Sequence, residues 1–171
     1  MTALTLNLTE SQALTVVRSF LLSILPTTVE VFRGQDNRVP EPQGMDFIVL
    51  TPIGRERLAL NTVTGSSVAG TREDLQPVQV TIQVDAHGDS GADNVQLIST
   101  LFHSDIGADY FTSQNANVAP LYSSDAHQIA FLNGEHQVET RWTMDMAIEC
   151  NVTVSTQQDY ANVLSIEVKP A

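Results

Sequence analysis

The longest regular pattern of hydrophobic and polar positions lies late in the chain, between residues 138 and 154. Every even position there is apolar except Thr140, and every odd position is polar except Ala147. Alternation with a period of two is typical of a β-strand with one dry and one wet face. At about 3.3 Å per residue, this run would reach roughly 56 Å, well beyond an ordinary strand. The strand therefore either bends at a bulge or leaves the domain as an arm that buries its dry face on a neighbour.

A helical pattern stands near the start of the chain. Thr9 and Gln12 have the spacing of a capping box. Apolar residues then recur at three- and four-residue intervals from Leu14 to Leu25, and Pro26 ends the run. We predict an amphipathic helix over residues 10–25 with one face in the core.

Shorter apolar runs predict the other elements. The expected strands cover residues 29–31, 47–50, 57–60, 78–84 and 163–168. A second helix is expected from about Asn94, fraying between residues 103 and 107, with one more turn up to Phe111. Residues 61–74 are rich in Gly, Ser and Thr without an apolar period, so we predict a mobile loop there.

The order of these elements indicates the fold class. A helix, then strands, then a helix, then strands is typical of an α+β fold. We expect an antiparallel or mixed β-sheet with two main helices packed on one face. The length of 171 residues predicts a single domain over residues 1–171.

The charge of the chain is strongly negative and uneven. Twenty acids and eight bases give a net charge of −12 at pH 7. After residue 84 the only basic side chains apart from histidine are Arg141 and Lys169. An acidic field repels nucleic acid and anionic lipid, because DNA binding depends on cations that displace counterions from the phosphates. The charge serves either solubility alone or a surface that faces DNA without gripping it.

The single cysteine, Cys150, excludes an internal disulfide and any metal site made of several cysteines. Assembly in a cytoplasm is compatible with this composition. The apolar stretch from Leu14 to Leu25 is interrupted by Arg18 and is too short to span a bilayer. Residues 1–13 lack the basic region of a signal peptide. We expect a soluble protein without a membrane partner.

Few residues suggest chemistry. Asp85, His87, Asp89 and Asp93 alternate like a Ca²⁺ loop but lack the EF-hand register, and Asp and Gly also belong in any strand-to-helix turn. The histidines have no metalloprotease spacing, and no nucleophile or phosphate-loop motif is present. We therefore predict no enzyme, no cofactor and no metal, with Cys150 as a core residue.

Arg141 and Trp142 enter the long strand. Arg141 is expected on the wet face beside Glu139 and Asp145, as part of a surface charge pair. Trp142, the single tryptophan, belongs either to the core or to an interface as an anchor.

Several blocks resemble the neck or tail-terminator proteins of long-tailed bacteriophages and prophages. The blocks are Gly34–Pro42 leading into Phe47–Pro52, Asp93–Asn94 before Ile98–Phe102, Pro120–Tyr122, Phe131–Glu135 and Glu139–Trp142. They follow one another across residues 30–155, which is most of the chain. Within them, the residues of the motif that could lie at an interface are Asn37, Arg38, Pro40, Asn133, Gly134, Arg141 and Trp142.

The resemblance implies a small α+β protomer that closes into a ring, typically a hexamer, on the finished tail tube. It implies tube and possibly sheath proteins as partners on one side and head-connector or neck proteins on the other. Genomic DNA would pass through without specific binding. The chain would lie in the virion neck or tail after assembly in the host cytoplasm, and the family has no catalytic residues.

Two other readings stay open at this point. The chain could be another phage structural part, such as a head-completion protein, a tail tube subunit or a baseplate piece. From a different class, it could be a small Ca²⁺-binding module or hydrolase that uses the acidic turn at residues 85–93.

Overall fold

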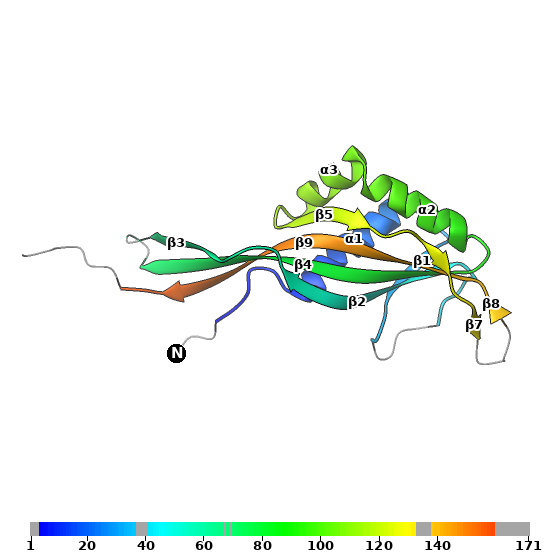
Figure 1. Ribbon diagram of the computed structural model, residues 1–171, viewed down its shortest axis with the longest axis horizontal. Helices are drawn as coiled ribbons and strands as arrows, with labels where there is room; N and C mark the ends of the chain where they lie inside the picture. The colour runs from blue at the N-terminus through cyan, green and yellow to red at the C-terminus, as the bar shows by residue number, and fades with distance from the viewer. Residues whose placement is uncertain (1–3, 37–40, 67, 69, 133–137, 160–171) are drawn as a thin grey trace, which may run out of the picture.

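The computed structural model describes residues 4–36, 41–66, 68, 70–132 and 138–159. Three helices accompany nine strands in the described part of the chain (Figure 1). The helices are α1 (Glu10–Ile24), α2 (Gly91–Phe102) and α3 (Asp105–Gln114). The strands are β1 (Glu30–Arg33), β2 (Phe47–Arg57), β3 (Thr62–Ser66), β4 (Thr71–His87), β5 (Val118–Ser123), β6 (His127–Gln128), β7 (Phe131–Leu132), β8 (Val138–Glu139) and β9 (Arg141–Gln157).

Seven of the strands form one open sheet with the order β1-β2-β4-β9-β5. β3 joins the same edge of β4 as β2, and β6 joins β9. The pairings are antiparallel except β1 with β2, which is parallel, so the sheet is mixed. β7 and β8 form a separate two-stranded sheet. The predicted α+β class with a mostly antiparallel sheet is confirmed.

The first helix begins as its sequence predicts. The backbone N–H of Gln12 donates to Thr9 Oγ1 at 3.3 Å, and the backbone N–H of Thr9 donates to Gln12 Oε1 at 2.8 Å. This capping box satisfies two backbone donors that a helix start otherwise leaves unpaired. The buried face of α1 consists of Ala13, Leu14, Val16, Val17, Phe20 and Leu21.

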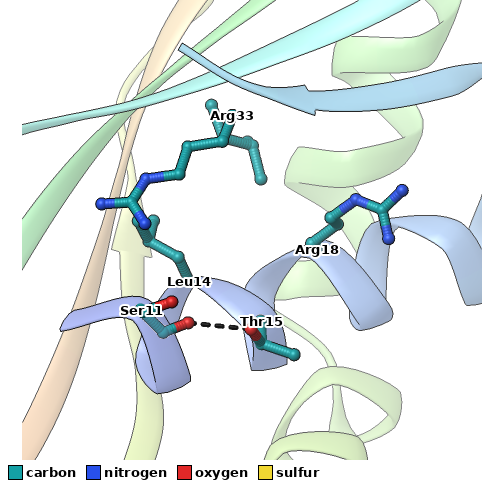
Figure 2. Close-up of a pocket in the computed structure, with 6 residues that line it drawn as sticks. Ser11, Leu14, Thr15, Arg18 and Arg33 are labelled. Atoms are coloured by element: carbon teal, nitrogen blue, oxygen red, sulfur yellow. Dashed lines mark hydrogen bonds between the residues drawn. The ribbon is translucent and has the colours of Figure 1, made fainter. Parts of the chain in front are cut away.

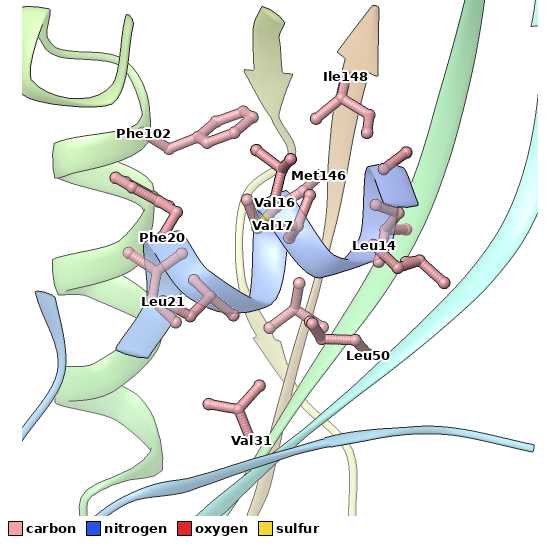
Figure 3. Packing of buried hydrophobic residues seen from close by; sticks show 14 of the residues in the cluster. Leu14, Val16, Val17, Phe20, Leu21, Val31, Leu50, Phe102, Met146 and Ile148 are labelled. Carbon is pink, nitrogen blue, oxygen red and sulfur yellow. The ribbon is translucent and has the colours of Figure 1, made fainter. Parts of the chain in front are cut away.

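The core lies between one face of the sheet and the helices. Figure 3 shows α1 side chains meeting Leu50 of β2, Met146 and Ile148 of β9, and Phe102 of α2. Phe20 is fully buried, and its ring centroid lies 5.4 Å from that of Phe111. This aromatic contact joins α1 to α3 within the core.

Three expectations about individual elements change, and a fourth stays untested. The loop predicted over residues 61–74 is wrong, because β3 and the start of β4 form a β-hairpin there. Three helices are present instead of two, since α3 is a ten-residue helix of its own. Only Arg57 of the predicted strand at 57–60 belongs to a strand. The strand predicted over residues 163–168 lies outside the described residues.

Candidate assembly interface

The two longest strands extend past the helices as an arm. β4 and β9 are 17 residues each and pair along their full length without a register shift. Their fully buried apolar residues lie only within Val78–Ala86 and Met144–Cys150. Figure 1 shows the other halves, with β3 beside them, projecting beyond the helices. The arm consists of Thr62–Ser66, Thr71–Gln76 and Val152–Gln157. Of the two alternatives for the overlong strand, the structure shows the projecting arm, and burial of its dry face on a neighbour stays a prediction.

The surface of the arm is polar, with one exposed apolar side chain near the start of β3 and one in the turn at the tip. All five residues of β3 are exposed. Val63 is 52% exposed and Val68 in the turn is 98% exposed. Arg72 donates to both carboxylate oxygens of Asp74 at 2.9 Å, a half-buried pair at the surface of the kind that contributes about 1 kcal/mol or less. The arm therefore adds little to the stability of the chain and offers its surface to contacts.

One edge of the arm is covered by the N-terminal segment. The backbone N–H of Asn7 donates to the Thr153 carbonyl at 3.1 Å, and the Asn7 amide oxygen accepts from the Thr153 N–H at 2.7 Å. Leu6 forms a bridge to Val154 in β9. On the opposite edge, β3 pairs with β4 and with no other strand among the described residues. An unpaired strand edge of this kind is a template for another chain.

A proline marks the boundary between the body of the sheet and the arm. The Pro77 carbonyl accepts from the Leu58 N–H at 3.0 Å, so the Pro77 backbone faces β2 and β3. Proline has no N–H to continue that ladder. β2 ends at Arg57, and pairing with β4 resumes only at Thr62. The ladder is therefore interrupted at the point where the arm begins.

Arg141 lies at the start of β9, on the sheet face away from the helices. Its Nε atom lies 3.9 Å from Oδ1 of Asp85, which is only 7% exposed. Asp85 also accepts from the Thr143 hydroxyl and, at 2.7 Å, from the Gln83 amide. A buried carboxylate needs such partners, because unpaired burial of a charge is costly. Asp85 is thus a partner of Arg141 that the sequence pattern did not identify.

His87 stacks on Phe47 beside this acid. The ring centroids are 4.5 Å apart and the rings are within 5° of parallel. Burial lowers the pKa of His87 below its ordinary value, although the charge of Asp85 acts in the opposite direction. The imidazole is consequently favoured in its neutral form.

Trp142 faces the helix side of the sheet. It pairs with Ala86 of β4 and Gln128 of β6. The side chain is partly buried and packs against the core cluster. The other five motif residues predicted from the family resemblance, Asn37, Arg38, Pro40, Asn133 and Gly134, lie outside the described residues.

The acidic turn does not form a cluster of metal ligands in the described part of the chain. Asp85 and His87 belong to β4 and are buried, whereas Asp89 and Asp93 are exposed on the turn and in α2. No group of three His, Cys, Asp or Glu side chains among the described residues could hold a metal ion. Burial raises the pKa of the Cys150 thiol to about 11, which suppresses the nucleophilic thiolate.

A small depression lies between the start of α1 and the sheet. It is lined by Ser11, Leu14, Thr15, Arg18, Arg33 and Leu50 (Figure 2). Arg18 Nε donates to the Val31 carbonyl at 2.8 Å, and Arg33 pairs with Glu10 at 3.1 Å. These contacts tie α1 to β1. Within the described residues, no helix is long and apolar enough to cross a bilayer.

Comparisons with known proteins point to one class. The family model of the phage neck terminator protein matches residues 11–170. Among solved structures, the chain is similar to the sheath/tube terminator of the PVC extracellular contractile injection system in its extended state, determined by cryo-electron microscopy. The TM-score is 0.52 at 9% identity, over 96% of this chain and 64% of that chain. The chain thus spans less than two thirds of the length of that terminator. No curated protein matches the chain.

Proposed function

The chain belongs to the phage neck terminator proteins, and on that premise we propose that six copies of it close into a ring on the end of the tail tube. The family resemblance predicted from the sequence is confirmed by this match. The role of the chain is therefore structural, as a terminator of a phage tail. A non-enzymatic role is part of this proposal and rests on the family match.

The arm is the observation that supports ring formation. A ring of identical subunits uses head-to-tail contacts that close by rotation. The arm reaches beyond the helices and carries exposed apolar side chains together with an open strand edge at β3. In the proposed ring each arm lies on the next copy, which covers Val63 and pairs or shields that edge.

The two ends of the ring would meet different partners. One end would cap the tail tube, and a sheath where one exists, once the tube has reached its length. The other end would form the joining surface for the head connector or neck proteins. These partners follow from the family and are part of the proposal, as are assembly in the host cytoplasm and the final position in the virion neck.

The charge of the chain suits a channel for DNA. Each copy carries a net charge of −12, and a ring multiplies this field. Acidic walls offer few cations to displace counterions from the phosphates, so DNA gains no contacts that would slow its passage. The genome would pass through without being bound.

A shortened arm tests the proposal. Residues 65–72 would be replaced by Asn-Gly, which joins Thr64 to Glu73, a cross-strand pair, by a two-residue hairpin turn. All fully buried apolar residues lie outside this deletion, so the variant should unfold at nearly the wild-type temperature. We expect the wild type to form closed rings by negative-stain microscopy and by native mass, alone or on tail tubes, and the shortened variant to remain monomeric.

A point variant separates arm contacts from arm length. Val63→Asp places a charge on an exposed apolar position and should reduce ring formation without changing the unfolding temperature. Thr64→Asp adds the same charge to the opposite face of β3 as a control. Rings that form equally well from the shortened chain and from Val63→Asp would refute the role of the arm.

A further inference from the structure

The sheet ends in two margins that lie directly opposite each other. β1 covers β2 only along Phe47–Leu50, so beyond this β2 has no partner strand on its outer side among the described residues. On the far side, β5 is the last strand of the sheet. The register places Arg57, Val78, Cys150 and Val118 in one row across β2, β4, β9 and β5. The free part of β2 is thus level with β5.

The strand directions of the two margins are compatible with a repeating sheet. β2 runs antiparallel to β4, β4 to β9 and β9 to β5, so β2 and β5 run in opposite directions. A second copy placed with its β2 beside β5, and with its strands pointing the same way, would continue this alternation. A head-to-tail contact between the two margins therefore does not disturb the strand order.

The backbone edge of β5 is blunted, so side chains have to provide much of such a contact. Pro120 has no N–H. The Ser123 N–H already donates to Nε2 of His103 at 3.0 Å. His103 Nδ1 in turn lies 2.9 Å from the Ser99 carbonyl, so this ring links Ser123 of β5 to α2. At these two positions β5 therefore has no backbone N–H available to bond to a strand of another chain.

The side chains of the two margins are opposite in charge. Arg55 and Arg57 are exposed on β2 and pair across the sheet with Val80 and Val78, which face the helices. α3 lies against β5 on that same face and exposes Asp105 and Asp109. Between Arg72 and Arg141 the sequence contains neither lysine nor arginine. The β5–α3 margin therefore carries carboxylates and neither lysine nor arginine, whereas the β2 margin carries two guanidinium groups.

Each margin also exposes apolar side chains beside its charges. On β2, Ile53 is 51% exposed, and Leu58 directly after the strand is 44% exposed. On the other margin, Ile106 of α3 is 57% exposed, and Tyr122 of β5 is 51% exposed on the sheet face away from the helices. An apolar centre with charged residues at its rim is the usual composition of a specific protein interface.

We propose that the β2 margin of one copy packs against the β5–α3 margin of a second copy, with Arg55 and Arg57 facing Asp105 and Asp109. This inference rests on the proposed ring and adds a second contact between neighbouring copies to the one proposed for the arm. A contact between two different surfaces of one chain propagates head to tail and closes when the rotation permits. The charges set the partner and the register, while Ile53 and Ile106 lie in the buried part of the contact.

Charge exchange between the margins tests the proposal. One variant carries Arg55→Glu and Arg57→Glu, and a second carries Asp105→Lys and Asp109→Lys. Each variant alone should be monomeric under conditions in which the wild type forms rings, because like charges then face each other across the contact. An equimolar mixture should restore rings in which the two variants alternate at a ratio of 1:1. Native mass spectrometry distinguishes these species.

A control variant and the possible contrary results distinguish the assignment of the margins from the formation of a ring. Glu56→Lys changes the charge on the other face of β2 and should leave the rings intact. Rings from either double variant alone, or a mixture that stays monomeric, would overturn the assigned margins while the ring itself stands. A wild-type chain that stays monomeric both in solution and on tail tubes would overturn the ring and the margins together.

Discussion

Phe20 of α1 contacts aromatic rings of both other helices, and its replacement tests whether these contacts hold the three helices together. The ring is fully buried. Its centroid lies 6.2 Å from that of Phe102 in α2, and 5.6 Å and 5.4 Å from those of Tyr110 and Phe111 in α3. Phe20→Ala would leave a cavity where these three rings meet α1, and we expect the change to weaken the attachment of both later helices.

The cost of this substitution follows from the buried area. A buried phenylalanine removes about 150–250 Å² from water, which corresponds to roughly 4–6 kcal/mol at about 25 cal/mol per Å². Real unfolded chains already bury part of their apolar surface, so the area that Phe20 buries on folding is smaller than this range. Phe→Ala changes in other protein cores cost about 3–5 kcal/mol. We expect the free energy of unfolding to fall by about 4 kcal/mol. For a chain of this size, the melting temperature would fall by roughly 8–16 °C.

Urea and thermal unfolding followed by circular dichroism measure this change, and hydrogen exchange reports on α3 separately. Leu22→Ala provides a control in the same helix, because Leu22 is 42% exposed. The control should cost less than about 1 kcal/mol. If Phe20→Ala costs no more than Leu22→Ala, or leaves exchange in α3 unchanged, the aromatic contacts do not hold the helices together.

Three further changes have expected outcomes. The Cys150 thiol, with its pKa raised to about 11, should resist a thiol reagent at pH 8 in the folded chain and react in denaturant; rapid labelling of the folded protein would contradict its burial. The pKa of His87 is lower in the folded chain than its unfolded value of about 6.5, so below that pH the unfolded chain binds more protons than the folded chain. The stability that His87 contributes is therefore fully present above about pH 6.5 and falls as the pH drops below it. His87→Phe should flatten this dependence in urea titrations between pH 7 and 5, and an unchanged slope would argue against it. At the start of α2, Asp46 accepts hydrogen bonds from the backbone N–H and the hydroxyl of Ser90, both at 3.1 Å. Asp46→Ala should therefore lower the free energy of unfolding by about 1–2 kcal/mol, measured by thermal unfolding. An unchanged stability would show that solvent replaces these hydrogen bonds.

Local patterns in the sequence predict the elements that have one buried face. The capping box at Thr9 correctly predicts the start of α1, and the alternation correctly predicts β9 as a strand, although Thr143 and Ala147 on the expected wet face are buried. β3 escapes prediction because all its residues are exposed, so no period of two distinguishes its faces. α3 escapes because only Gly107 and Phe111 of its ten residues are buried, which leaves too short an apolar pattern.

The surfaces proposed for assembly are harder to predict for a different reason. The distance between Arg55 and Asp105 in the sequence says nothing about which margins they occupy. Strand order and register decide that, and these depend on long-range pairing that single-sequence patterns do not contain. Asp85 is a similar case, since its contact with Arg141 follows from the pairing of β4 with β9.

The interruption at Pro77 has a mechanical consequence. Next to this residue, β4 and β9 are the two strands that continue from the body of the sheet into the arm, because β2 has ended and β3 has not begun. Asn7 lies along one edge of this junction, and Leu58 and Asn61 bond to β4 on the other. Two-stranded ribbons twist more freely than wide sheets. In the proposed ring, twisting at this narrow junction would let the arm follow the orientation of the neighbouring copy while the core of each chain keeps its packing.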